Sequence, residues 1–221
     1  MKNNEKLDII YEDKDILVVN KPAGLLTIST EKEKEKTLFH KVYMYIKKKN
    51  KNNKIFIVHR LDKDTSGIVL FAKNESLKLK LQNDWDNLAK ERKYVTIVKG
   101  KVTKDKGQII SWLKETKTLM TYSSNVCNDG KKAITNYRVI NSNDLYSFLD
   151  IEIKTGRKNQ IRVHMRDMGN PILGDHKYGP KDGFRRMYLH AYKLVIEHPI
   201  SKKILEFETD IPKEFIKLIK D

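Results

Sequence analysis

Residues 55–73, IFIVHRLDKDTSGIVLFAK, place a dense group of polar side chains between two apolar runs. The flanking runs IFIV and IVLFAK are typical of buried strands. Between them, Asp64, Thr65 and Ser66 are ordinary turn formers, because their short side chains bond nearby backbone groups. Turn formation does not explain HRLD (59–62), where charged and apolar residues alternate at the mouth of a core strand. This stretch therefore predicts two strands of the sheet, and it indicates that the HRLD loop between them has a function.

Asp62 is the candidate functional group of this loop. A carboxylate held partly out of water needs a cationic partner to stay ionised. An ionised, oriented carboxylate can serve as a nucleophile or a general base. The spacing alone is equally compatible with a structural turn.

Strand patterns outnumber helix patterns along the chain. Apolar or alternating runs predict strands in these segments: 8–22 (two strands), 55–58, 68–73, 92–100, 107–113, 119–127, 131–140, 145–154, 187–199 and 203–210. Helices are predicted at 37–48, 75–90, 158–169 and 212–220. Because strands and helices do not alternate regularly, we expect an α+β fold with a large mixed, mainly antiparallel sheet flanked by helices and loops.

Residue spacing supports these helices. Thr37 is a suitable N-cap for the first helix, which places Leu38, Val42 and Tyr45 on one face. The helix at 75–90 carries an apolar stripe that we interpret as core: Leu77, Leu81, Trp85 and Leu88. Gly169 is expected to end the helix at 158–169, and Pro212 to stand in the first turn of the last one.

The net charge of +16 favours a polyanionic partner. Lysine-rich stretches such as 47–54 also have a simpler explanation, since surface lysine is tolerated almost anywhere. The eight arginines are more informative, because five of them lie within residues 157–186. Arginine offers a planar fork for carboxylate, phosphate or base recognition.

Composition excludes several other classes. No apolar run is long enough to span a membrane and residues 1–10 contain no signal-peptide core, so we expect a cytoplasmic protein without a membrane partner. The single cysteine, Cys127, rules out an internal disulfide and a thiolate-rich metal cluster. Among apolar strand residues, Cys127 is expected to be a small buried hydrophobe.

A second polar cluster, TGRKNQIRVHM, occupies residues 155–165. On a helix, Arg162 and Arg166 share one face, and Gln160 and His164 form a neighbouring row. The spacing of either row is equally compatible with ordinary surface. The segment resembles a strand-to-helix corner with Arg157 at its mouth. A guanidinium from this cluster is a candidate partner for the carboxylate of the first loop.

Five motifs together resemble the RluA-type pseudouridine synthases. They are, in this order, VVNKPAGL (18–25), HRLDKDTSGIVLFAK (59–73), RKYVTIVKG (92–100), TGRKNQIRVHM (155–165) and LHAYKLVIEHP (189–199). The resemblance runs from residue 8 to the C-terminus. It implies one catalytic domain over residues 8–221 behind a short tail of residues 1–7, with no separate N-terminal RNA-binding domain.

The resemblance implies roles for three catalytic residues. Asp62 matches the essential aspartate that acts on the target uridine, and Tyr94 matches the tyrosine that stacks on the base and helps proton removal. Arg162 matches the arginine that pairs with the aspartate. Asn159 departs from the family, which usually has histidine there, and we expect it to alter a supporting hydrogen bond without abolishing activity.

Substrate-binding residues follow from the same resemblance. Arg60 is expected near the flipped nucleotide, Leu189 in the base pocket, and Lys21 with Pro22 behind the catalytic loop. Arg157 joins them as a candidate RNA contact. We therefore expect the chain to isomerise uridine to pseudouridine in ribosomal RNA, transfer RNA or both, as a monomer that contacts RNA through basic loops at 31–54 and 176–186.

This reaction conserves every atom of the uridine, so neither cofactor nor metal is expected, and no Walker loop, dinucleotide-binding glycine motif or zinc pattern occurs. Two alternatives stay open. A non-catalytic RNA-binding module explains the charge but not HRLD beside KPAG. A metal-dependent hydrolase would draw on His59, Asp62, His164 and His190, which lack the helical spacing of such sites.

Overall fold

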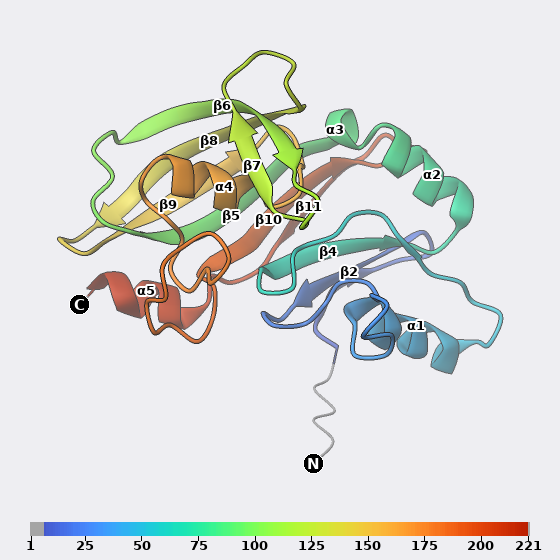
Figure 1. Ribbon diagram of the computed structural model, residues 1–221. Helices are drawn as coiled ribbons and strands as arrows, with labels where there is room; N and C mark the ends of the chain where they lie inside the picture. Colours follow the sequence, from blue (N-terminus) through green and yellow to red (C-terminus); the bar gives the residue numbers. More distant parts are fainter. Residues whose placement is uncertain (1–6, 221) are drawn as a thin grey trace. The chain divides into compact units, whose positions relative to one another are not determined.

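The computed structural model describes residues 7–220 (Figure 1). The tail predicted at residues 1–7 lies outside this range except for Leu7. The chain forms two compact units. The first unit contains the described residues up to Lys90 together with Lys193–Thr209, and the second unit contains Glu91–Tyr192 and the segment from Asp210 onward. Within the described residues, no helix is both long enough and apolar enough to cross a membrane.

The first unit is built on antiparallel strands. Strand β2 pairs with β1 on one side and with β4 on the other, β3 also pairs with β4, and β11 pairs with β10. The strands are β1 (Ile9–Glu12), β2 (Ile16–Lys21), β3 (Phe56–Ile57), β4 (Ser66–Ala72), β10 (Leu189–Glu197) and β11 (Ile204–Glu208). Of β10, the part from Lys193 onward belongs to this unit. The two runs that flank HRLD are thus β3 and β4, as the apolar pattern predicts, and they place the loop at the start of a buried strand.

Helix α2 (Glu75–Asn83) packs on one face of this sheet, where Leu77 and Leu81 join Ile16, Val18 and Leu70 in the core. The single helix predicted over 75–90 is wrong, because the chain breaks at residue 84, forms the short helix α3 (Trp85–Leu88) and enters β5 at residue 89. The sequence NDWDN (83–87) accounts for the break, since such side chains compete with helical hydrogen bonds.

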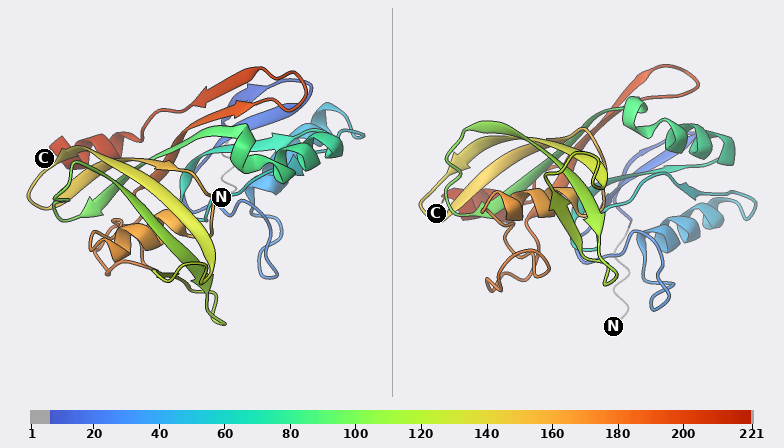
Figure 2. Two further views of the ribbon diagram at one scale, coloured as in Figure 1. Left: turned by 90° about the horizontal axis from the view of Figure 1, so that it is seen from above. Right: turned by 45° about the horizontal axis from the view of Figure 1, so that its top comes forward.

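Helix α1 (Leu38–Lys49) lies on the opposite face of the same sheet from α2 (Figures 1 and 2). The Thr37 side chain accepts a hydrogen bond from the backbone N–H of His40, which confirms the predicted N-cap. At the other end of the helix, Lys49 and the Tyr45 hydroxyl both donate to Glu12 of β1. Burial disfavours the charged form of Glu12, but these donors and Lys73 lower its pKa to about 2.

The second unit is a meander of antiparallel strands in the order β5-β9-β8-β6-β7. The strands are β5 (Ala89–Lys99), β6 (Lys106–Glu115), β7 (Thr121–Ser124), β8 (Lys131–Ser142) and β9 (Tyr146–Ile153). With the first unit, this confirms the predicted α+β class and the mainly antiparallel sheet.

Each face of this second sheet is covered by one helix. Helix α4 (Gln160–Asp167) packs Ile161 and Met165 against side chains of β5, β8 and β9 such as Ile151. On the other face, helix α5 (Lys213–Lys220) packs Phe215 against Phe148 of β9. Gly169 adopts a φ of 86° just after α4, in agreement with the predicted helix end.

Cys127 corrects a prediction. Strand β7 ends at Ser124, so Cys127 lies in the following turn and is exposed. Its neighbour Val126 is 67% exposed. The apolar letters around Cys127 thus belong to a turn that leads into the NDG sequence, and not to a strand.

Candidate active site

The HRLD loop is fixed to the first unit through Leu61. The Thr27 hydroxyl donates to the Leu61 carbonyl at 2.6 Å and accepts from the Leu61 N–H at 3.2 Å. One residue further on, the Asp62 carbonyl accepts from the Thr65 N–H at 3.2 Å, which closes the turn. Asp62 is half-buried between the buried Leu61 and the exposed Lys63. Its side chain is therefore carried by a backbone that is bonded on both sides.

Lys21 supports the same loop through hydrogen bonds to backbone carbonyls. Its side chain is fully buried, and its ammonium donates to the carbonyls of Pro22 at 3.0 Å, Leu25 at 2.7 Å and Lys63 at 2.8 Å. An ammonium has three N–H groups, and burying it is costly unless they are bonded. Lys21 thus ties the KPAG segment to the residue that follows Asp62.

His59 has a structural part in the loop. Its Nε2 accepts a hydrogen bond from the backbone N–H of Leu70 at 3.1 Å, so the ring proton sits on Nδ1 in this arrangement. The ring also stacks on Trp85, with centroids 4.8 Å apart. The adjacent Arg60 is exposed, so its side chain reaches solvent from an anchored backbone.

In the second unit, the TGR corner is held by Gln160, a buried side chain with four hydrogen bonds. Its Oε1 accepts from the Thr155 hydroxyl at 2.8 Å and from the Arg157 N–H at 3.0 Å. Its Nε2 donates to the Ile134 carbonyl and to the Thr135 hydroxyl on β8. The helical row of Gln160 and His164 is therefore buried, and it is not part of the protein surface. The Arg157 side chain bonds the Lys132 carbonyl through Nε at 3.1 Å.

Arg162 forms a buried two-point ion pair with Asp175. Its Nε and Nη2 lie 2.7 Å and 2.8 Å from the two carboxylate oxygens. Its Nη1 donates to the Oδ1 of Asn159 at 2.8 Å. Burial alone would raise the pKa of Asp175, but the hydrogen bonds and charge of Arg162 hold it below its usual range. Asp175 also accepts the backbone N–H groups of Lys177 and Tyr178.

Tyr178 completes the support of this arginine. The Arg162 guanidinium lies 4.9 Å from the centre of the Tyr178 ring, and that of Arg166 lies at 5.5 Å, so the two arginines share a face as predicted. The Tyr178 hydroxyl accepts from the Thr121 N–H at 2.9 Å and from the Asn159 amide at 3.1 Å. Arg162 is therefore oriented by Asn159, just before α4, and by Asp175 and Tyr178, which follow α4. Thr121 of β7 in turn holds Tyr178.

Asn159, which departs from the family pattern, has a φ of 55° at the start of α4. This left-handed conformation is unfavourable for most residues, and asparagine tolerates it better than they do. Its side chain bonds both Arg162 and Tyr178. Asn159 thus adopts the left-handed conformation that this position requires, and its side chain also helps to hold Arg162.

His164 is fully buried between the hydroxyls of Ser111 and Thr135, each 2.9 Å from one ring nitrogen. Burial lowers its pKa from 6.5 to about 4, so the ring is neutral at pH 7. Both nitrogens bind side chains of the sheet, which gives His164 a structural role and not a ligand's role.

Tyr94 and Leu189 belong to one apolar cluster of the second unit. Leu189 is buried, and Tyr94 packs against the same group, which includes Ile161 and Met165 of α4. The predicted stacking residue and the predicted pocket residue thus meet beside the helix that carries Arg162. The predicted ion pair between Asp62 and Arg162 joins residues of the two units and stays a prediction.

Sequence reasoning missed Asp175 and Tyr178, which lie in GDHKYG (174–179). The structure shows why a glycine precedes them, because Gly174 has a φ of 71° and an added Cβ would meet the Arg186 carbonyl oxygen at 1.8 Å. Only glycine fits such a site. A required glycine before a buried aspartate marks a constrained turn.

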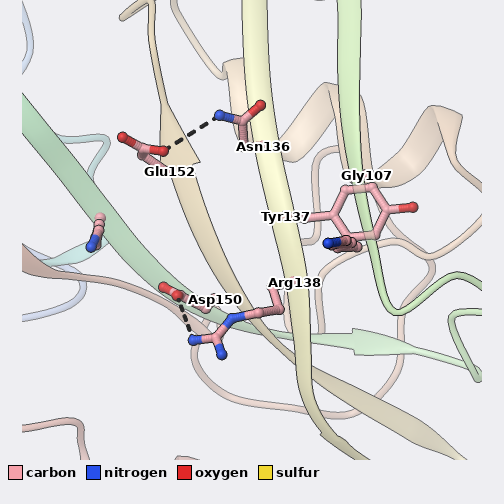
Figure 3. Close-up of a pocket in the computed structure, with 8 residues that line it drawn as sticks. Gly107, Asn136, Tyr137, Arg138, Asp150 and Glu152 are labelled. Atoms are coloured by element: carbon pink, nitrogen blue, oxygen red, sulfur yellow. Dashed lines mark hydrogen bonds and ion pairs between the residues drawn. The ribbon is translucent and has the colours of Figure 1, made fainter.

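The second unit also contains an open cavity of about 510 Å³, distinct from these residues (Figure 3). Its wall includes the pairs Arg138–Asp150, at 3.3 Å, and Asn136–Glu152, at 3.4 Å, contributed by β8 and β9. None of the residues singled out in the sequence lines it. Two more of its charged residues form ion pairs outside the wall, Glu152 with Lys154 and Lys93 with Glu91. Such pairing is typical of a solvated sheet face.

Comparison with known proteins agrees with the motifs. A family model described as RNA pseudouridylate synthase matches residues 15–167. The chain belongs to the RNA pseudouridylate synthase family. This pseudouridine synthase is therefore an isomerase that acts on RNA, as the five motifs predict.

Two relatives and one solved structure illustrate the similarity. The chain is 37% identical to the uncharacterized RNA pseudouridine synthase YlyB of Bacillus subtilis, over 97% of this chain and 72% of that protein. It is also 37% identical to the ribosomal large subunit pseudouridine synthase D of Borreliella burgdorferi, over 97% and 68%. The human RNA pseudouridylate synthase domain containing 4 shares the fold, with a TM-score of 0.77, 22% identity and coverage of 95% and 90%.

Proposed function

We propose that this synthase converts uridine to pseudouridine in ribosomal RNA, with Asp62 as the essential carboxylate. The observation that carries the proposal is the support of the Asp62 turn by the buried Lys21 ammonium and by Thr27. Such support suits a group that must keep its orientation during catalysis. The ribosomal target is supported by the name of the Borreliella burgdorferi relative.

The reaction breaks the bond from ribose C1′ to uracil N1 and forms a bond from C1′ to C5. The proton that leaves C5 balances the one gained at N1, so no external electron donor or acceptor is needed. Asp62 assists the cleavage as nucleophile or base. The Tyr94 ring stacks on the freed base, which is worth about 1–3 kcal/mol, and Leu189 with its apolar neighbours retains the base while it rotates.

Arg162 has a particular electrostatic character in this proposal. Asp175 already compensates its charge through a two-point pair. In the predicted pairing with Asp62, the arginine would therefore supply oriented N–H groups more than net positive charge. Preorganised donors of this kind favour charge that develops in the transition state, because they do not have to reorient.

The test compares Asp62→Asn with Asp64→Asn, a matched change two residues away on the exposed part of the same loop. Each protein is incubated with ribosomal RNA transcripts that carry tritium at uracil C5, and released tritium measures turnover. We expect Asp64→Asn to retain the wild-type rate within about threefold, since its side chain faces solvent. Asp62→Asn should bind RNA normally and release at least a thousandfold less tritium. Full turnover by Asp62→Asn would show that another group does the chemistry.

The substrate is tested separately in cells. A pseudouridine map of total RNA is compared between cells that lack the gene and cells complemented with the wild-type chain or Asp62→Asn. A ribosomal site that only the wild type restores supports the proposal. A restored site found only in transfer RNA would refute the ribosomal assignment while keeping the chemistry.

A further inference from the structure

Helix α1 presents an exposed aromatic face. Tyr43 is 39% exposed and Met44 is 44% exposed, although the core side of this helix is already filled by Leu38, Val42 and Ile46. The Phe39 ring stacks on Tyr43, with centroids 6.5 Å apart and planes at 25°. The helix therefore displays aromatic surface that its own packing does not require.

Basic side chains continue this face toward the end of the helix. Lys47 lies one turn beyond Tyr43, with its ammonium 5.4 Å from the ring centre. Lys48 and Lys51 are exposed just beyond it. The Lys47 ammonium also donates to the Lys51 carbonyl at 2.6 Å, and Lys49 forms an ion pair with Glu12 of β1. Residues 31–54 contain nine lysines and three glutamates, so the region carries a clear positive excess.

An aromatic ring bordered by ammonium groups matches the chemistry of an unpaired nucleotide. Aromatic side chains stack on the faces of unstacked bases, and neighbouring lysines bind the flanking phosphates. Within a duplex the bases are already stacked on one another, so a ring such as Tyr43 gains little from double-stranded RNA. The charge excess disfavours a basic partner surface and favours a polyanion.

We propose that the Phe39–Tyr43–Lys47 face of α1 is an accessory RNA contact that binds an unpaired nucleotide flanking the target. Tyr43 stacks on the base, Phe39 supports the Tyr43 ring from behind, and Lys47, Lys48 and Lys51 bind adjacent phosphates. This inference rests on the proposed function, because it assumes that the substrate is RNA with a structured target and unpaired flanks.

The first test uses a single tyrosine. Tyr43→Ala should weaken the binding of an RNA hairpin with single-stranded flanks by about 5- to 150-fold, the range of one base–aromatic stack. Tyr43→Phe keeps the ring and should bind within threefold of wild type. Tyr122→Ala is the matched control, since Tyr122 of β7 is also 39% exposed. A blunt duplex of the same length should bind wild type and Tyr43→Ala alike.

The second test concerns the lysines. Replacing Lys47, Lys48 and Lys51 by alanine should flatten the dependence of log Kd on log salt by about 2 for single-stranded RNA, because each lost phosphate contact removes about 0.7. The control neutralises three exposed lysines elsewhere, Lys80, Lys203 and Lys217. Equal slopes in the two triple variants would overturn the inference.

Activity separates this inference from the proposed function. If wild type forms pseudouridine, Tyr43→Ala should raise KM and leave kcat at saturating RNA unchanged. Wild-type levels of both constants and of RNA affinity would overturn the accessory contact alone. Failure of the wild type to form pseudouridine in any RNA would instead refute the proposed function. A self-association of wild type that is lost in Tyr43→Ala, with RNA affinity unchanged, would assign the face to a second copy of the chain and refute the RNA contact.

Discussion

Replacing Asp175 by asparagine should destabilise the protein by about 3 kcal/mol. Removing one charge of a buried ion pair costs about 3–5 kcal/mol, because the other charge stays buried without compensation. Asparagine can keep the contacts of Oδ1, which accepts from Arg162 Nη2 and from the N–H groups of Lys177 and Tyr178. It loses the contact of Oδ2 and places an amide donor against Arg162 Nε. The lower end of the range is therefore expected.

Urea unfolding followed by tryptophan fluorescence measures this loss. With a slope of about 2–3 kcal/mol/M, the unfolding midpoint should fall by about 1–1.5 M. The matched control is Asp167→Asn, which breaks the half-exposed ion pair between Asp167 and Arg166 on α4, the helix that carries Arg162. It should lower the free energy of unfolding by less than about 1 kcal/mol. Equal midpoints for wild type and Asp175→Asn would refute the reasoning.

The same substitution has a defined pH dependence. The pKa of Asp175 is lower in the folded state than in the unfolded chain, so its carboxylate stabilises the protein above the unfolded value. That contribution is lost as the pH falls through the folded value. The stability difference between wild type and Asp175→Asn should therefore be full at neutral pH and shrink in acid. A difference that grows in acid would contradict the assignment.

Three further outcomes are expected. The pKa of His164 is lowered from 6.5 to about 4 in the folded protein, so between these pH values the unfolded chain binds a proton that the folded chain does not. The free energy of unfolding should therefore fall by up to about 3 kcal/mol from pH 6.5 to pH 4. Urea titrations at several pH values measure this fall, which should be smaller in His164→Gln. Lys21→Met leaves three carbonyls without their donor and should lower thermal stability and abolish tritium release, whereas a variant with wild-type turnover would exclude a supporting role. Cys127 should react with a disulfide reagent in the native state at the rate of an unhindered thiol; protection until unfolding would contradict its exposure.

The strands and most helices were predictable because their apolar residues follow simple periods. Alternation along β8 and β9 and the i, i+4 spacing of Leu77 and Leu81 directly encode the buried faces. The predictions from apolar periodicity were wrong where polar turn-forming residues interrupt the apolar pattern. The helix break at Asp84 and the turn at Cys127 both lie in stretches rich in Asn and Asp, residues that favour turns over regular helix or strand.

The candidate site was predictable only where a motif carried it. Lys21, Asp62 and Arg162 were named from their motifs, and the structure adds the contacts of Lys21 and Arg162. The partner of Arg162 within its own unit, Asp175, lies thirteen residues along the chain, beyond any helical or strand period. Such pairing depends on how a loop returns to a helix, which local patterns do not encode.

Because Lys21 is buried, its chemical modification can report on the opening of the turn that carries Asp62. Amine acylation needs an accessible nitrogen lone pair, and this ammonium is enclosed and engaged with three carbonyls. Acylation of Lys21 therefore requires local opening of the segment that carries Asp62. Among 37 lysines, most of them at the surface, its slow modification, followed by mass spectrometry, would report the opening rate of that turn without any engineered label. Bound RNA that covers the turn would slow the acylation of Lys21 further.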